Sequence, residues 1–160
     1  MTRRVKLVAG SVVAIDLGNS EMSFARSLTP PLFEFFDRRA GDDESPALEE
    51  IVSSPALFRI NVMSYAVKSG RWPVLGVVPL SQDELSYREV FFKQDAISGE
   101  LSLYWEDHTT KQTFSKQASP KECAKLERAS VWDPDHAEDR LRDHHAGRPN
   151  KWVESLRLKT

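Results

Sequence analysis

Hydrophobic and polar positions alternate over short runs in the first third of the chain, which predicts strands rather than helices. Residues 12–15 form a β-branched run that stops at the turn signal Gly18-Asn19-Ser20, and a second run covers 22–28. Thr29-Pro30-Pro31 breaks the pattern before a third run over 32–36. Three short strands in succession predict an antiparallel meander.

The middle of the chain alternates between short helical and strand patterns. Ser45 followed by Pro46 is a typical helix start, and Gly70 is suited to stop a later helical turn. The predicted elements are a helix over 46–53, a strand over 57–62, a helical turn over 64–68, and a hairpin of strands over 89–93 and 100–105.

Helix signals dominate the C-terminal part. Ser119 and Glu122 are spaced as a capping box, in which each side chain bonds the other residue's backbone N–H. Asp133-Pro134 then starts a helix predicted over 134–145, and Gly147 is placed to end it. A last strand over 129–132 and a short helix over 149–156 complete the prediction. Strands first and helices last are typical of an α+β protein.

Composition indicates one ordinary globular domain over residues 1–160. Hydrophobic residues make up 40% and charged residues 29%, with a mean hydropathy of −0.46. Arg3 and Arg4 precede an uncharged stretch that resembles a secretory leader, but Gly10 and Ser11 interrupt it, so a strand is the better interpretation. No stretch approaches the roughly 20 apolar residues needed to cross a bilayer.

The charge balance and the cysteine content exclude several classes of function. Lys plus Arg total 22 against 24 for Asp plus Glu, a net charge of −2 that does not favour binding to nucleic acid or to an anionic membrane. The single cysteine, Cys123, excludes an intrachain disulfide and a multi-thiolate zinc site, and fits the reducing cytoplasm.

Three histidines near the C-terminus are the main candidates for metal or acid–base chemistry. His136, His144 and His145 lie among several acids, but the first two would be about 12 Å apart on a helix. They would need ligands from elsewhere to bind one ion, and a solvated helix face with Glu138–Arg142 pairing is the better interpretation. No catalytic motif is found, so we expect neither enzyme activity nor a cofactor.

Charge clustering suggests a surface for another protein. Five acids fall within nine residues without a base, which would speed capture of a basic partner. Arg71 and Trp72 join an arginine and an aromatic ring in a loop fixed by Pro73, a composition common at interfaces. The predicted contacts are Asp42, Asp43, Glu44, Arg71 and Trp72, while an ordinary solvated loop remains the alternative for the acids.

Several of these segments resemble the immunity protein 26 family of bacterial polymorphic toxin systems. The resemblance covers residues from about 9 to 156. One departure lies in the first hairpin, where Gly18 is the single glycine in place of the family's glycine-rich turn. The segments that carry the resemblance include Ser54-Pro55-Ala56-Leu57-Phe58-Arg59, Lys68-Ser69-Gly70-Arg71-Trp72-Pro73-Val74-Leu75-Gly76, Phe91-Phe92-Lys93-Gln94-Asp95 and Gly147-Arg148-Pro149-Asn150-Lys151-Trp152.

This resemblance implies a small α+β domain with a strongly bent antiparallel sheet of SH3-like, partly open form. It also implies a protein that neutralises a cognate toxin domain by binding it. Two alternatives remain open from the residues. One is a metal-dependent or hydrolytic enzyme built on the C-terminal histidines and acids, and the other is a nucleic-acid-binding module that exposes Phe33, Phe35 or Trp105.

Overall fold

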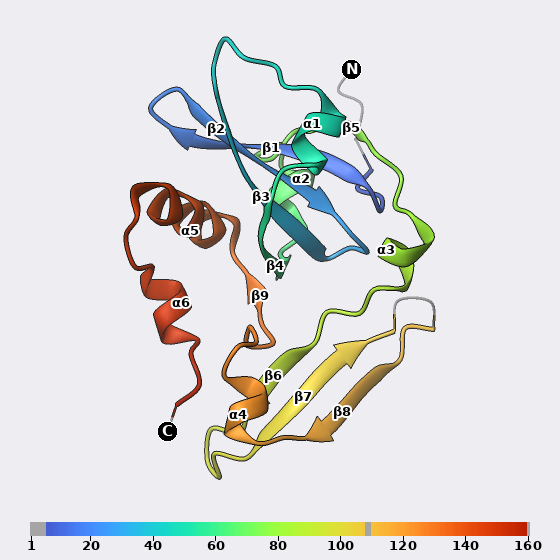
Figure 1. Ribbon diagram of the computed structural model, residues 1–160, viewed down its shortest axis with the longest axis vertical. Helices are drawn as coiled ribbons and strands as arrows, with labels where there is room; N and C mark the ends of the chain where they lie inside the picture. The colour runs from blue at the N-terminus through green and yellow to red at the C-terminus, as the bar shows by residue number, and fades with distance from the viewer. Residues whose placement is uncertain (1–5, 108–109, 160) are drawn as a thin grey trace.

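The computed structural model describes residues 6–107 and 110–159 and places its strands in two sheets (Figure 1). The larger sheet has the order β5-β1-β2-β3-β4-β9, and the smaller has the order β6-β7-β8. The strands are β1 (Ser11–Gly18), β2 (Glu21–Ser27), β3 (Leu32–Gly41), β4 (Ala56–Val62), β5 (Val74–Val77), β6 (Phe91–Gln94), β7 (Leu101–Glu106), β8 (Thr113–Gln117) and β9 (Val131–Trp132).

The helices are short except for one near the C-terminus. They are α1 (Leu48–Val52), α2 (Tyr65–Lys68), α3 (Gln82–Ser86), α4 (Pro120–Cys123), α5 (Pro134–Ala146) and α6 (Lys151–Ser155). The α+β class and the position of the longest helix are confirmed. Within the described residues, the search for a helix long and apolar enough to span a membrane finds none.

The predicted meander is present, and the sheet extends it at both ends. Strands β1 to β4 pair antiparallel in succession, and β5 returns to the free side of β1. The exception to the antiparallel expectation is β9, which pairs parallel to β4 through Asn61 with Val131 and Val62 with Trp132. The small sheet lies between β4 and β9 in the chain, and a connection of this length permits two strands to pair in parallel.

Both faces of the six-stranded sheet are covered, which explains why β1 is a continuous apolar run. Val13 and Ile15 pack on one face with Leu141 of α5, whereas Val12 packs on the other with Ile51 of α1. A strand buried on both faces loses the alternation that a half-exposed strand shows. Arg3 and Arg4, which begin the leader-like stretch, lie outside the described residues. The observed strand β1 confirms that the apolar residues after them form a strand.

The β1–β2 turn forms without the family's run of glycines. Gly18 and Glu21 are paired, and the two residues between them, Asn19 and Ser20, have φ values of 53° and 60°. Positive φ at both central positions defines a type I′ turn, whose twist matches that of a hairpin. The Asp16 carboxylate supports the turn by accepting a hydrogen bond from the Gly18 N–H at 2.8 Å.

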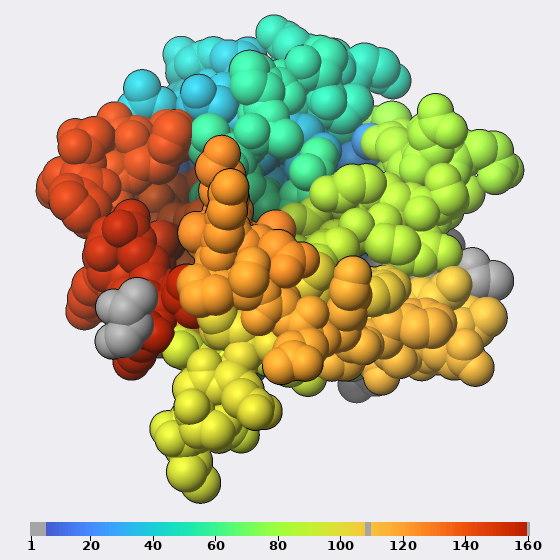
Figure 2. Space-filling model, turned by 60° about the horizontal axis from the view of Figure 1, so that its bottom comes forward, coloured from blue at the N-terminus to red at the C-terminus, as the bar shows by residue number. Residues whose placement is uncertain are grey.

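The small sheet carries a turn that projects from the molecule. Figure 2 shows the segment that joins β6 to β7 standing out from the surface, and Ile97 in this turn is 99% exposed. Asp95 orders the turn because its Oδ1 accepts hydrogen bonds from the N–H groups of Ile97 and Ser98. These bonds stabilise the charged carboxylate and lower the pKa of Asp95.

Candidate functional site

A buried carboxylate on α5 anchors the loop that follows α2. Glu138 accepts two hydrogen bonds from Arg71, Nε to Oε2 at 2.7 Å and an Nη to Oε1 at 2.8 Å. The indole Nε1 of Trp72 donates to the same Oε2 at 2.9 Å. The Glu138 side chain is 5% exposed and that of Arg71 is 44% exposed. The hydrogen bonds to Glu138 raise the pKa of Arg71 and hold its guanidinium in one orientation.

The local backbone explains why Arg71 and Trp72 point to α5. Gly70 follows α2 with φ +83°, a left-handed conformation that favours glycine and turns the chain. The Trp72 N–H then donates to the Ala66 carbonyl at 2.8 Å, and the Pro73 carbonyl accepts from the Ala14 N–H at 3.0 Å. The loop is thus fixed to both α2 and β1.

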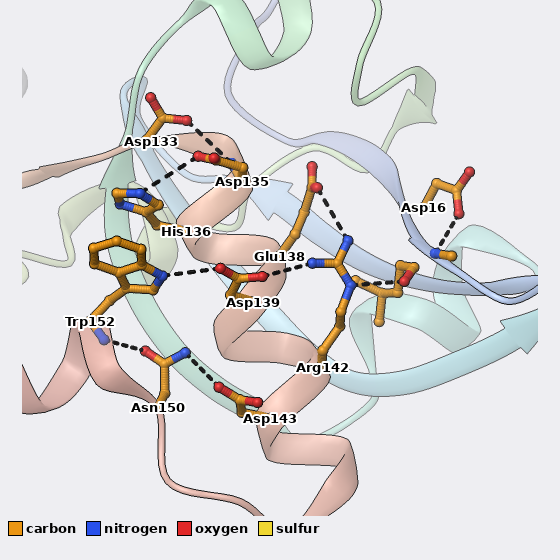
Figure 3. Close-up of polar contacts among 12 residues, drawn as sticks. Asp16, Asp133, Asp135, His136, Glu138, Asp139, Arg142, Asp143, Asn150 and Trp152 are labelled. Atoms are coloured by element: carbon orange, nitrogen blue, oxygen red, sulfur yellow. Dashed lines mark hydrogen bonds and ion pairs between the residues drawn. The ribbon is translucent and has the colours of Figure 1, made fainter.

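A second polar group lies at the start of α5. The Tyr65 hydroxyl donates to Oδ1 of Asp133 at 2.6 Å, and this bond raises the pKa of Tyr65 to about 12. Asp133 caps α5 by accepting from the Asp135 N–H. Figure 3 shows this backbone hydrogen bond. The interaction between the Asp133 and Asp135 carboxyl groups lowers the pKa of Asp133 and raises that of Asp135. Exposed hydrogen-bonded groups of this kind are well suited to contact a polar partner.

The acidic residues predicted at an interface are all exposed. Asp42, Asp43 and Glu44 follow β3, and Glu49 and Glu50 lie in the first turn of α1. Two of them are engaged locally, because Glu44 accepts from the Gly41 N–H at 3.0 Å and Glu50 pairs with Arg38 at 3.2 Å. Asp42 and Asp43 present the freely solvated negative charge that electrostatic steering requires.

Trp72 requires a correction to the predicted contact set. Its side chain is 0% exposed, and its ring packs edge-on against Phe33 and Phe35 with centroids 5.8 Å from each. Trp72 therefore offers no surface to a partner, although it supports the carboxylate that holds Arg71. The sequence pattern indicates Glu138 only as the partner of Arg142 on a solvated helix face, whereas its side chain is buried. No pattern indicates Tyr65, because its contact with Asp133 joins parts of the chain that are distant in sequence.

The three histidines lie at two separate places on α5. The ring of His136 stacks on Trp152 with centroids 3.5 Å apart, and Trp152 in turn donates to Asp139 (Figure 3). His144 and His145 lie at the far end of α5, where Asp37 of β3 approaches them. The predicted Glu138–Arg142 pair is present, with an N···O distance of 3.6 Å. A shared site that includes His136 is thus not formed.

The residues required by the nucleic-acid alternative are mostly buried. Phe33 is 1% exposed and Phe35 is 0% exposed, both in the core under α5. Trp105 is half-buried and stacks on Phe114 of β8. Base stacking needs aromatic faces open to solvent, so Phe33 and Phe35 do not supply them.

Fold and contacts together define a small α+β protein in which a buried carboxylate holds one surface arginine in place. Residues 8–103, more than half of the chain, match the family model described as Immunity protein 26. The chain belongs to this family. Neither the curated proteins nor the solved structures provide a match. Arg71 and the acidic residues lie inside the matched segment, whereas Glu138 lies beyond it.

Proposed function

We propose that this protein neutralises a cognate bacterial toxin domain by binding it in the cytoplasm, without catalysis of its own. Membership of the immunity protein 26 family carries the proposal. The toxin domain would be encoded next to this chain, as in a polymorphic toxin system. Inhibition needs only that the complex blocks the toxin's substrate or holds the toxin in an inactive state.

The proposed contact surface combines charge for rapid capture with one rigid anchor. Asp42, Asp43 and Glu44 supply exposed negative charge for a basic toxin surface. Arg71 is partly exposed, and its two hydrogen bonds to Glu138 fix its side chain before the partner arrives. Such preorganisation reduces the side-chain entropy lost on binding, and arginine is frequent among residues that dominate binding energy.

Coexpression and complex formation with the toxin domain encoded beside this chain test the function itself. We expect the chain to restore growth to cells that make the toxin, and the two proteins to elute together in size-exclusion chromatography. Growth arrest that persists at equal expression, with no complex detected, would overturn the proposal.

The contact surface is tested by association kinetics at several salt concentrations. Replacing Asp42, Asp43 and Glu44 with serine should slow association about tenfold at low salt and flatten its salt dependence. The matched control replaces three other exposed acids, Asp83, Glu100 and Glu154, and changes the net charge by the same amount. Equal rates for the two triple variants would exclude the acidic loop as the docking surface.

A further inference from the structure

An aspartate and two histidines converge where β3 passes the end of α5. Nε2 of His144 lies 3.4 Å from Oδ1 of Asp37, and Nδ1 of His145 lies 3.8 Å from the same oxygen. The three potential ligand atoms all lie within 4.8 Å of one another. This cluster plays no part in the proposed toxin contacts.

A bulge in β3 brings the carboxylate to this position. In the β2–β3 ladder Ser23 pairs with Arg39 and Ala25 pairs with Phe35, so residues 36–38 stand opposite Phe24 alone. Such irregularities re-aim side chains and often lie beside functional sites. The backbone is nevertheless anchored, because the Asp37 N–H donates to the Pro55 carbonyl at 2.8 Å.

The distances match those between ligands around a zinc ion. Zinc binds imidazole nitrogen and carboxylate oxygen at about 2.0–2.2 Å, which separates two ligands of a tetrahedral site by roughly 3.3–3.6 Å. The nitrogen-to-oxygen distance of 3.4 Å already fits, and that of 3.8 Å needs only a small rotation of the exposed Asp37 side chain toward the buried His145. Imidazole with carboxylate also favours zinc, nickel or copper over magnesium or calcium.

The surroundings restrain one ligand, and the end of a helix faces the cluster. The side chain of His145 is 6% exposed, and its Nε2 is buried without a hydrogen-bond partner among the described residues. Both histidines belong to the last turn of α5, where the helix dipole places partial negative charge. Arg39 adds a positive charge nearby, which its ion pair with Glu21 at 2.7 Å offsets in part.

We propose that Asp37, His144 and His145 form a binding site for a divalent transition metal, with ligand distances that fit the tetrahedral geometry of zinc. The ion would join β3 to the end of α5 and leave a fourth position open to water. This proposal is independent of toxin binding.

Titration of the full chain, free of any affinity tag, with Zn²⁺ against a chromophoric chelator tests the site. We expect one equivalent to bind, and Asp37→Asn and His144→Asn each to weaken binding at least about tenfold. Co²⁺ should give the strong visible absorption of a four- or five-coordinate ion in the wild type, and each variant should lose it. The side chains of Asp37 and His144 are 47% and 44% exposed, so each variant gives an independent test if the other folds poorly.

The control variants keep the residue types but lie outside the cluster. Asp43→Asn and His136→Asn should bind Zn²⁺ as the wild type does. The site is excluded if the wild type binds no Zn²⁺ at about 0.1 mM. It is equally excluded if the cluster variants bind as tightly as the controls.

Discussion

The indole N–H of Trp72 donates a hydrogen bond to Oε2 of Glu138 at 2.9 Å, between a fully buried ring and a nearly buried carboxylate. A carboxylate removed from water needs several donors, and Trp72 and Arg71 together supply three hydrogen bonds. The contact joins the loop after α2 to α5. The same carboxylate thereby stabilises the fold and orients a surface arginine.

Two substitutions of Glu138 should lower the free energy of unfolding by different amounts. Glu138→Gln keeps an oxygen acceptor for Trp72 but removes the charge opposite Arg71, and we expect a loss of about 1–2 kcal/mol. Glu138→Ala also leaves the buried indole N–H without a partner, and we expect the free energy of unfolding to fall by about 3 kcal/mol. Urea denaturation followed by tryptophan fluorescence measures both values.

Glu154 provides the matched control on a solvent-exposed ion pair. It lies 3.1 Å from Arg157, with side chains 48% and 67% exposed. Because exposed pairs of this kind contribute little, Glu154→Gln should cost less than about 0.5 kcal/mol. Equal losses for Glu138→Gln and Glu154→Gln would contradict the role assigned to the buried carboxylate.

Elements with strong local signals could be predicted from the sequence. The Ser119–Glu122 capping box is present, and the helix predicted over 134–145 is α5, Pro134–Ala146. These signals lie within a few residues and act through backbone N–H groups at helix starts, so tertiary packing does not override them. The Ser81–Glu84 capping box of α3 is an equally local signal that the sequence analysis missed.

Other features depend on contacts between distant parts of the chain. Strand β8 is exposed along its whole length, so it shows no apolar alternation for a sequence pattern to detect. Trp72 has the composition of an interface residue, yet Glu138, far along the chain, provides the buried partner for its N–H. Asp37 likewise reaches His144 only because β3 bulges beside α5.

The β1–β2 turn predicts a stabilising substitution. Ser20 has φ 60°, a left-handed conformation that costs a non-glycine residue about 1 kcal/mol. Ser20→Gly places glycine after Asn19, the preferred pair for a type I′ turn, and should raise the free energy of unfolding by about 0.5–1 kcal/mol. Ser53→Gly, at φ −87°, should give no gain. The same gain at both positions would show that turn strain is not the cause.

Two glycines of similar φ should respond differently to alanine. Gly10 has φ +92°, and a Cβ there would lie 2.4 Å from the Val78 carbonyl oxygen. Gly99 has φ +76°, with no neighbouring atom within 4 Å of such a Cβ. Gly99→Ala should cost about 1 kcal/mol, from backbone strain alone. Gly10→Ala should cost more than about 2 kcal/mol because a backbone clash is added. Denaturant midpoints compare the two variants, and equal losses would contradict the clash.

The Tyr65–Asp133 hydrogen bond predicts a pH dependence at alkaline pH. This bond to the Asp133 carboxylate raises the pKa of Tyr65 to about 12, above the ordinary tyrosine value of 10.0. The unfolded chain therefore releases this proton first, and the stability that the bond contributes is lost as pH rises from about 10 to about 12. Near-ultraviolet absorbance of tyrosinate, taken as the difference between the wild type and Tyr65→Phe, measures the pKa.

Asp133→Asn separates the effect of the charge from that of the helix cap. Asparagine caps a helix as well as aspartate does, so α5 should remain intact. Without the negative charge, the pKa of Tyr65 should fall from about 12 toward its ordinary value of 10.0. Tyr87, whose pKa of about 12 arises from burial and from Glu89, should titrate unchanged in the same variant. A Tyr65 that still titrates at about 12 in Asp133→Asn would show that its raised pKa does not come from this carboxylate.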